Sequence, residues 1–241
     1  MPNIKRIALI TGASSGIGKE TARIFLENGF VVLNFDKNKS DDKDIENYLI
    51  NLEDIQGIKK KFNLVKKKYK NIHILINNAA VTISDNLLDY KISDWNKSIA
   101  INLTAPFVIS KLFASLAIKN KHKASIVNVS SIGGKLSFPN NPAYQATKAA
   151  LIHLSKSMAY DLAKHNIRVN NIIPGYVNTP MNKKSWQNKK LKYERSKRNL
   201  LNRWGDPKEI AEVIFFISNE KSSFITGADI AVDGGWLTKG I

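Results

Sequence analysis

The chain of 241 residues contains no cysteine. Disulfide bonds and thiolate metal sites are therefore excluded. The lack of cysteine is consistent with a cytoplasmic protein. Long apolar runs are also missing, because no stretch approaches the roughly 18 residues needed to cross a membrane. The opening MPNIKRIALITG has too short an apolar run to be a secretory signal. We expect a cytoplasmic protein with no membrane partner.

Acidic residues are scarce, with 20 Asp and Glu against 37 Lys and Arg, which gives a formal net charge of +17. Such an excess is typical of proteins that bind nucleic acid. However, arginine, whose planar fork suits bases and phosphates, stands at only six positions, and the lysines are spread along the whole chain. No known nucleic-acid binding module is recognisable. We therefore expect a basic, solvated surface and no nucleic-acid partner.

Metal-ligating patterns are missing as well. The four histidines show no ligand spacing, and the acidic residues between 41 and 44 lack the rest of a cation loop. We predict no metal site.

What the chain has is a regular alternation of short Val- and Ile-rich runs with longer amphipathic segments. This alternation predicts βα units that feed a parallel sheet. No internal repeat or linker interrupts it, so we predict one α/β domain over residues 1–241. The expected strands are 6–11, 30–36, 47–52, 73–79, 125–131, 168–175 and 229–235, and the expected helices are 17–28, 54–70, 93–119, 144–164 and 207–218.

Two segments depart from the alternation. Residues 36–48 are polar and rich in turn formers, although a parallel crossover normally needs a dozen or more residues and a helix. We predict that this crossover helix is vestigial or absent. Residues 176–206 follow the sixth expected strand without a βα pattern, and we interpret them as a substrate loop or lid.

A glycine-rich turn joins the first expected strand to the first expected helix. In LITGASSGIG, Gly12, Gly16 and Gly18 permit a tight turn and close approach of the backbone, while the helix N-terminus offers free N–H groups to a pyrophosphate. Asp36 ends the next strand, where a carboxylate accepts hydrogen bonds from ribose hydroxyls and repels a 2′-phosphate. The pattern favours NAD over NADP, although Lys37 and Lys39 keep NADP open.

Tyr144 and Lys148 lie four residues apart in AYQATKAA, so a helix places them side by side. An ammonium near a phenol favours the phenolate and lowers the phenol pKa. A tyrosine tuned in this way is a general acid or base near neutral pH. The same spacing is also common on solvated helices. The pair therefore indicates catalysis only if other motifs show a binding site beside it.

Further motifs indicate such a binding site. With the glycine turn, NNAA at 77–80, NVSS at 128–131 and AYQATK at 143–148 in this order, the chain resembles the short-chain dehydrogenase/reductase family from residue 5 to residue 236. The resemblance implies a Rossmann-like, doubly wound sheet of seven parallel strands with helices on both faces. It also implies a bound nicotinamide dinucleotide, hydride transfer between a secondary alcohol and a ketone, and usually a homotetramer or homodimer.

The resemblance assigns roles to particular residues. It implies that Tyr144 is the acid or base, that Lys148 holds the nicotinamide ribose and lowers the Tyr144 pKa, and that Ser131 orients the substrate. Asn102 matches the asparagine that kinks its helix and supports a proton relay through water. The residues that we expect to bind the cofactor are Gly12, Ser14, Ser15, Gly16, Ile17, Gly18, Asp36, Asn51, Leu52, Asn78, Ala79, Ala80, Tyr144, Lys148, Pro174, Gly175, Val177 and Thr179.

Two positions depart from the family pattern. Asn51 stands where aspartate is commoner near adenine, and Ala80 replaces a glycine. The second departure is mild.

The substrate stays open at this point. The endings PGYVNTPM and VDGGW are similar to 3-oxoacyl carrier-protein reductases, which mostly prefer NADPH. Sugar, polyol and hydroxy-acid dehydrogenases of the family fit Asp36 better. The basic segment 181–204 either attracts an anionic substrate or is a solvated helix. A dinucleotide-sensing protein without activity is the non-enzymatic alternative, and the presence of both Tyr144 and Lys148 argues against it.

Overall fold

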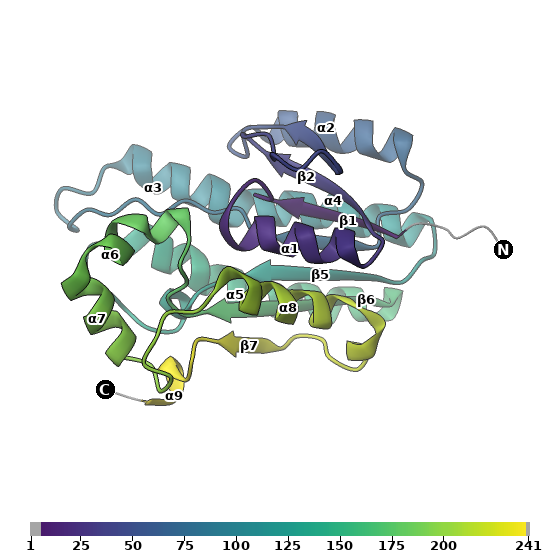
Figure 1. Cartoon of the computed structure of the whole chain (residues 1–241). Coiled ribbons are helices and arrows are strands. Elements are labelled where there is room, and N and C mark those ends of the chain that lie inside the picture. The colour runs from purple at the N-terminus through teal and green to yellow at the C-terminus, as the bar shows by residue number, and fades with distance from the viewer. Residues whose placement is uncertain (1–5, 240–241) are drawn as a thin grey trace.

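The computed structural model describes residues 6–239. Its centre is a seven-stranded parallel sheet in the order β3-β2-β1-β4-β5-β6-β7, which confirms the predicted doubly wound fold (Figure 1). The order reverses between β1 and β4, and in such sheets the crevice for ligands opens at the carboxyl ends of these strands. The strands are β1 (Ile7–Thr11), β2 (Val31–Asp36), β3 (Ile45–Leu49), β4 (Ile74–Asn77), β5 (Ala124–Val129), β6 (Ile167–Pro174) and β7 (Asp229–Val232).

Helices cover both faces of the sheet. One face carries α1 (Gly16–Glu27) and α8 (Pro207–Ser218), which pack against each other. The other face carries α2 (Ile55–Lys68), α4 (Ala105–Lys119) and α5 (Pro142–Leu162) (Figure 1). The shorter helices α3 (Ile92–Ile99), α6 (Lys183–Gln187), α7 (Lys189–Lys197) and α9 (Trp236–Lys239) belong to connections and to the C-terminal end.

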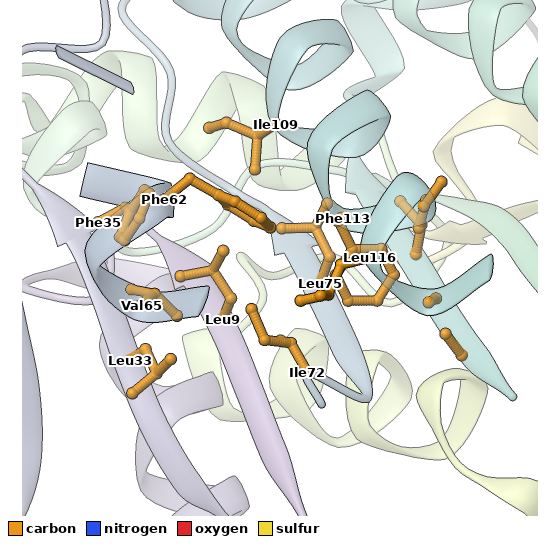
Figure 2. Packing of buried hydrophobic residues seen from close by; sticks show 14 of the residues in the cluster. Leu9, Leu33, Phe35, Phe62, Val65, Ile72, Leu75, Ile109, Phe113 and Leu116 are labelled. Carbon is orange, nitrogen blue, oxygen red and sulfur yellow. The ribbon is translucent and has the colours of Figure 1, made fainter. Parts of the chain in front are cut away.

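Two clusters of apolar side chains pack the helices against the two faces of the sheet. Between the sheet and α2, α4 and α5, Phe62 and Phe113 pack with Leu75 and are almost fully buried (Figure 2). Under α1 and α8, Phe25 contacts the rings of Phe30 and Phe215 edge to face. Burying each such side chain stabilises the fold by roughly 1.5–3 kcal/mol. The sheet is therefore a rigid base for its carboxyl edge.

The β2–β3 connection contains no helix, as the sequence predicts. The strand after it was predicted at 47–52 but runs at Ile45–Leu49, so that prediction was wrong by two residues at the start and three at the end. The shift has two causes: Ile45 is buried and pairs with Val32 of β2, and the Asn47 side chain accepts a hydrogen bond from the Ser40 N–H (2.8 Å). Residues 50–52 consequently lie beyond the strand, beside the carboxyl edge.

The predicted helix 93–119 is interrupted by a π-helical turn at Ala100–Thr104, between α3 and α4. By length and composition alone the continuous run Ile92–Lys119 is apolar enough to cross a membrane, and half of its most apolar window is buried within the protein. Phe113 and Ile109 of this run belong to the core, and a buried core helix passes the same test. The run is thus weak grounds for a membrane span.

His73 precedes β4 and accepts a hydrogen bond at Nδ1 from the Ile7 N–H (3.1 Å). Burial, the neighbouring His122 and Arg6 lower the His73 pKa to about 4. The neutral ring is favoured in the folded chain, so its stabilisation is complete above pH 6.5 and is lost as the pH falls through about 4.

We expect the free energy of unfolding to fall by roughly 2 kcal/mol more in wild type than in His73→Asn between pH 6.5 and 4, because Asn keeps an acceptor and does not titrate. Urea unfolding at several pH values measures this. His153→Asn, at an exposed position of α5, is the matched control and should follow wild type. Equal pH dependence in His73→Asn and wild type would contradict the role of His73.

Candidate active site

A cavity of about 540 Å³ opens at the carboxyl edge where the strand order reverses. Its volume lies in the range of roughly 300–1,000 Å³ for small-molecule sites. Most residues that the sequence singled out line it together: Gly12, Ser15, Gly16, Ile17, Asp36, Asn51, Leu52, Asn78, Ala79, Ala80, Ser131, Tyr144, Lys148, Pro174, Gly175, Val177 and Thr179. Ser14, Gly18 and Asn102 do not line it and instead support its walls.

The glycine turn forms one wall, between β1 and α1. A Cβ on Gly18 would stand 2.1 Å from the Gly12 carbonyl oxygen, so this close approach requires glycine. Gly12 has φ +73°, which glycine adopts readily. Ser15 caps α1 without a side-chain hydrogen bond, which leaves N–H groups of the first turn free for an anion. The turn fits a pyrophosphate.

Asp36 ends β2 at the rim of the cavity. Its carboxylate accepts hydrogen bonds from the Ser14 N–H (3.3 Å) and the Asn38 N–H (3.0 Å). These contacts fix the carboxylate beside the glycine turn. Together with the turn, it fits the ribose end of a dinucleotide, and we conclude that the residues present suit a nicotinamide dinucleotide.

Asn34 is a supporting residue that the sequence analysis did not single out. Its side chain is fully buried on β2, accepts from the Ala13 N–H (3.0 Å), and donates to Ser14 Oγ and Asn47 Oδ1 (3.0 Å each). The amide thus ties the glycine turn to β3 across a connection that has no helix. The sequence does contain a sign of this role, because Asn34 is the one amide in the apolar run VVLNFD. A buried amide needs hydrogen-bond partners, so its presence there indicates a structural contact.

Tyr144 and Lys148 lie on the first turns of α5, which begins with Pro142 in a position that favours helix initiation. The Lys148 ammonium is 5.7 Å from the centroid of the Tyr144 ring and donates to the Val129 carbonyl (2.7 Å). Lys148 is only 2% exposed, whereas Tyr144 is partly exposed to the cavity. The predicted side-by-side placement is confirmed.

The electrostatic expectation for this pair needs a correction. Burial raises the pKa of Tyr144, a hydrogen bond with Ser131 lowers it in part, and the Tyr176 phenol raises it further. Burial also lowers the pKa of Lys148 to about 8. In this structure burial outweighs the hydrogen bond with Ser131, so the pKa of the phenol lies above its ordinary value and the phenol is protonated at neutral pH.

Two serines at the end of β5 do different work. The Ser130 hydroxyl is buried and donates to the Lys148 carbonyl (2.9 Å), which ties the end of β5 to α5. Ser131 lines the cavity and accepts at Oγ from the Gly133 N–H (3.0 Å). Both serines line the cavity, but the Ser130 hydroxyl is bonded to the Lys148 carbonyl, so Ser131 is the serine that we expect to contact a substrate.

Asn102 lies in the π-helical turn and is fully buried. Its side-chain amide accepts from the Val81 N–H (2.8 Å) and donates to the Val81 carbonyl (2.9 Å) and to Thr147 Oγ1 (3.2 Å). Asn102 therefore links the segment after β4 to α5, and its contact on α5, Thr147, directly precedes Lys148. Such π-helical turns occur frequently at functional sites.

Polar contacts also hold α5 to the sheet. Asn128 Nδ2 donates to Ser155 Oγ (2.7 Å), and the Ser155 hydroxyl lies 2.6 Å from Asn171 Oδ1. Asn128 and Asn171 are paired neighbours on β5 and β6. Because hydrogen bonds are directional, this chain of contacts fixes the position of the helix that carries Tyr144.

The cavity has further lining residues that the sequence analysis did not assign to the site, apart from Lys37, which it weighed for NADP. Most of them lie within or near the predicted motifs, and they are Lys37, Asn38, Ile50, Glu53, Val81, Lys97, Ile101, Val129, Ser130, Pro180, Met181 and Asn182. Among residues 6–239, no group of three or more His, Asp or Glu side chains is placed to hold a metal ion.

Comparisons with known proteins match nearly the whole chain. A family profile described as enoyl-(acyl carrier protein) reductase matches residues 12–237. The 3-oxoacyl-[acyl-carrier-protein] reductase FabG of Thermotoga maritima is 36% identical over 241 residues, covering 95% of this chain and 97% of its own.

Solved structures are similar over nearly the whole chain. A 4-hydroxyisoleucine dehydrogenase complexed with NADH has a TM-score of 0.93 and 34% identity, covering 97% of this chain and 99% of its own. A protein of Beutenbergia cavernae, described as an NAD(P)-dependent gluconate 5-dehydrogenase with bound NADP, has a TM-score of 0.92 and 26% identity, covering 97% of each chain. The chain belongs to the short-chain dehydrogenase/reductase family and is an NAD(P)-dependent oxidoreductase that interconverts CH–OH and keto groups.

Proposed function

We propose that the protein is an NAD-linked dehydrogenase that interconverts a small secondary alcohol and its ketone, with Tyr144 as acid and base. The observation that carries this proposal is the placement of the Tyr144 phenol, Ser131 and Lys148 around one cavity that also contains Asp36 and the glycine turn. When bound, a nicotinamide cofactor supplies the hydride acceptor or donor. The protein supplies binding, orientation and proton transfer.

The proton is moved at the Tyr144 hydroxyl. During ketone reduction, the phenol donates its proton to the carbonyl oxygen; during alcohol oxidation, the phenolate accepts the hydroxyl proton. The raised pKa of Tyr144 makes the protonated phenol the resting form and favours the donor role at neutral pH. Ser131 holds the substrate oxygen near the phenol by a hydrogen bond.

Lys148 has two tasks in this proposal. Its buried ammonium lowers the cost of forming a phenolate, and its N–H groups hold the nicotinamide ribose. Asn102 supports the π-helical turn beside Thr147 and, through water, a path for protons from Lys148 to solvent. Pro174, Gly175, Val177 and Thr179 form the wall that faces the nicotinamide.

We further propose a preference for NAD over NADP. Asp36 places a carboxylate at the ribose end, and a 2′-phosphate there would meet a like charge. Asp36→Ala should raise the dissociation constant for NADH about 10- to 100-fold, because NADH loses hydrogen bonds to its ribose. The constant for NADPH should stay the same or fall, because the like charge beside the 2′-phosphate is gone. Quenching of protein fluorescence by each cofactor measures both constants.

Asp44→Ala is the matched control, since it removes the same charge from an exposed position of the same β2–β3 connection. It should leave both constants within twofold of wild type. If Asp36→Ala weakens NADPH more than NADH, the preference is the reverse of that proposed.

A sugar, polyol or hydroxy acid is the substrate class that we propose. Support comes from the similar dehydrogenases named for 4-hydroxyisoleucine and gluconate. A 3-oxoacyl carrier-protein reductase is the second candidate, because the FabG of Thermotoga maritima is 36% identical. Absorbance at 340 nm, with both cofactors, sugars, polyols, hydroxy acids and acetoacetyl thioesters, separates them. NADPH-linked reduction of the thioesters alone would select the second candidate.

We also propose a cytoplasmic homotetramer or homodimer. Phe107 of α4 (45% exposed) and Phe216 of α8 (46% exposed) offer apolar surface that another copy of the chain would cover. Closed symmetry makes such contacts self-complementary. Sedimentation of the purified protein measures the number of subunits.

A further inference from the structure

An aromatic cluster lies beside the part of the cavity wall that follows β6. It consists of Tyr176, Trp186, Trp204, Trp236 and Phe138, with ring centroids of neighbouring members 5.1–6.5 Å apart. Three of these residues come from segment 176–206, and the others follow β5 and β7. The cluster therefore packs the predicted substrate loop against the segments that follow β5 and β7.

Tyr176 connects this cluster to the catalytic phenol. It directly follows Gly175 and precedes Val177, both of which line the cavity. Its phenol also lies close enough to Tyr144 to raise the pKa of that residue. A group held against Tyr176 therefore lies beside the chain segment that lines the cavity.

Arg195 supplies such a group. This residue lies on α7, which sits beside the carboxyl edge of the sheet (Figure 1), and its guanidinium is 4.4 Å from the Tyr176 ring centroid and 6.0 Å from that of Trp204. Stacking on a ring occupies the face of a guanidinium and leaves its N–H edge free for hydrogen bonds.

No acidic side chain neutralises this guanidinium in the part of the chain that the structure describes. Among residues 6–239 the arginines in ion pairs are Arg23 and Arg203. Segment 181–204 contains nine Lys and Arg residues and one acidic residue, Glu194, and Glu209 pairs with Arg203, so most of its positive charge is uncompensated. The Arg195 side chain is therefore partly buried, permanently charged and without an ion-pair partner among the described residues. Such a guanidinium is suited to binding an external anion.

We propose that Arg195, held by Tyr176 and Trp204, binds the carboxylate of a small hydroxy acid or oxo acid whose alcohol or ketone faces Tyr144. A single planar fork with one charge matches a carboxylate in shape and charge, and the free edge permits two parallel hydrogen bonds. The inference rests on the proposed dehydrogenase function and narrows its substrate to acids.

The test uses binding as well as turnover. Protein saturated with NAD⁺ is titrated with four- to six-carbon hydroxy acids, including 3-hydroxybutyrate and gluconate, and with uncharged counterparts, including methyl 3-hydroxybutyrate and sorbitol. Tryptophan fluorescence reports binding, because Trp186, Trp204 and Trp236 all belong to the cluster. At least one acid should bind ten times more tightly than its uncharged counterpart.

Variants of Arg195 then test the site itself. Arg195→Met should weaken that acid about 10- to 100-fold and the uncharged counterpart less than twofold, with Arg195→Lys intermediate. Lys190→Met, which removes one charge from an exposed position of the same helix, should stay within twofold of wild type. Equal weakening by Arg195→Met and Lys190→Met would overturn the proposal, as would tighter binding of phosphate esters than of acids.

The outcomes separate this inference from the function on which it rests. Turnover of uncharged alcohols with no preference for acids would overturn the carboxylate site and leave the dehydrogenase function standing. Binding of acids through Arg195, without oxidation or reduction by either cofactor, would support the site and remove the dehydrogenase function.

Discussion

Tyr144→Phe should lower turnover at least about 1,000-fold in both directions while changing the dissociation constant for NADH less than threefold. The variant keeps the ring that lines the cavity and removes only the hydroxyl that moves the proton. Positioned proton transfer contributes about 10²- to 10⁴-fold to rate, and the hydroxyl also orients the substrate oxygen. Stopped-flow absorbance and NADH fluorescence measure the two quantities separately.

Tyr160→Phe is the matched control for this change. Tyr160 lies on the same helix, is 88% exposed, and should lose no activity as phenylalanine. If Tyr144→Phe keeps more than a tenth of wild-type turnover with a substrate that wild type accepts, another group moves the proton.

Lys148→Met should lower kcat/KM at least about 100-fold and weaken NADH about tenfold, without lowering the melting temperature. The loss of rate follows because the phenolate at Tyr144 loses its nearby cation. Stability is preserved for a different reason: burial already lowers the Lys148 pKa to about 8, so the charged form is costly in the fold. Methionine fills a similar volume without that cost.

Steady-state kinetics and thermal unfolding measure these opposite effects. Lys111→Met, at an exposed position of α4, is the control and should change neither. A large fall in melting temperature for Lys148→Met would mean that Lys148 serves the fold and not the chemistry.

The sequence predicted the sheet well because apolar periodicity reflects burial. β1, β4, β5 and β6 are buried along nearly their whole length, so their Val- and Ile-rich runs marked them within about two residues. β3 was misplaced because it is an edge strand whose polar residues, Glu46 and Asn47, bond to neighbouring segments. Periodicity cannot register such contacts.

The site was predictable where motifs are local. A backbone turn or a reactive group that is encoded within a few residues can be recognised in the sequence alone. This was so for the glycine turn, Asp36, Ser131, Tyr144 and Lys148, and all of these except Gly18 line the cavity. Asn34 escaped prediction because its three partners come from the glycine turn and β3, which only the fold brings together.

The direction of the Tyr144 pKa could not be read from spacing. Four residues of separation place the ammonium nearby but say nothing of how much water remains, and burial decides the outcome. Likewise, the sequence of the basic segment 181–204 shows an excess of positive charge but does not show which of its side chains lie near the cavity. The structure adds that Arg195 is stacked on Tyr176, a contact between a helix and the loop after β6.

The central claim, that Tyr144 moves the proton in a buried site, is tested most directly by the pH dependence of wild-type kcat/KM for alcohol oxidation. We expect it to rise about tenfold per pH unit from about pH 6 until an apparent pKa is reached, because oxidation needs the phenolate and the protonated phenol is the resting form. Ketone reduction should fall over the same range. An oxidation rate that is constant or decreases from about pH 6 to about pH 10 would contradict the account.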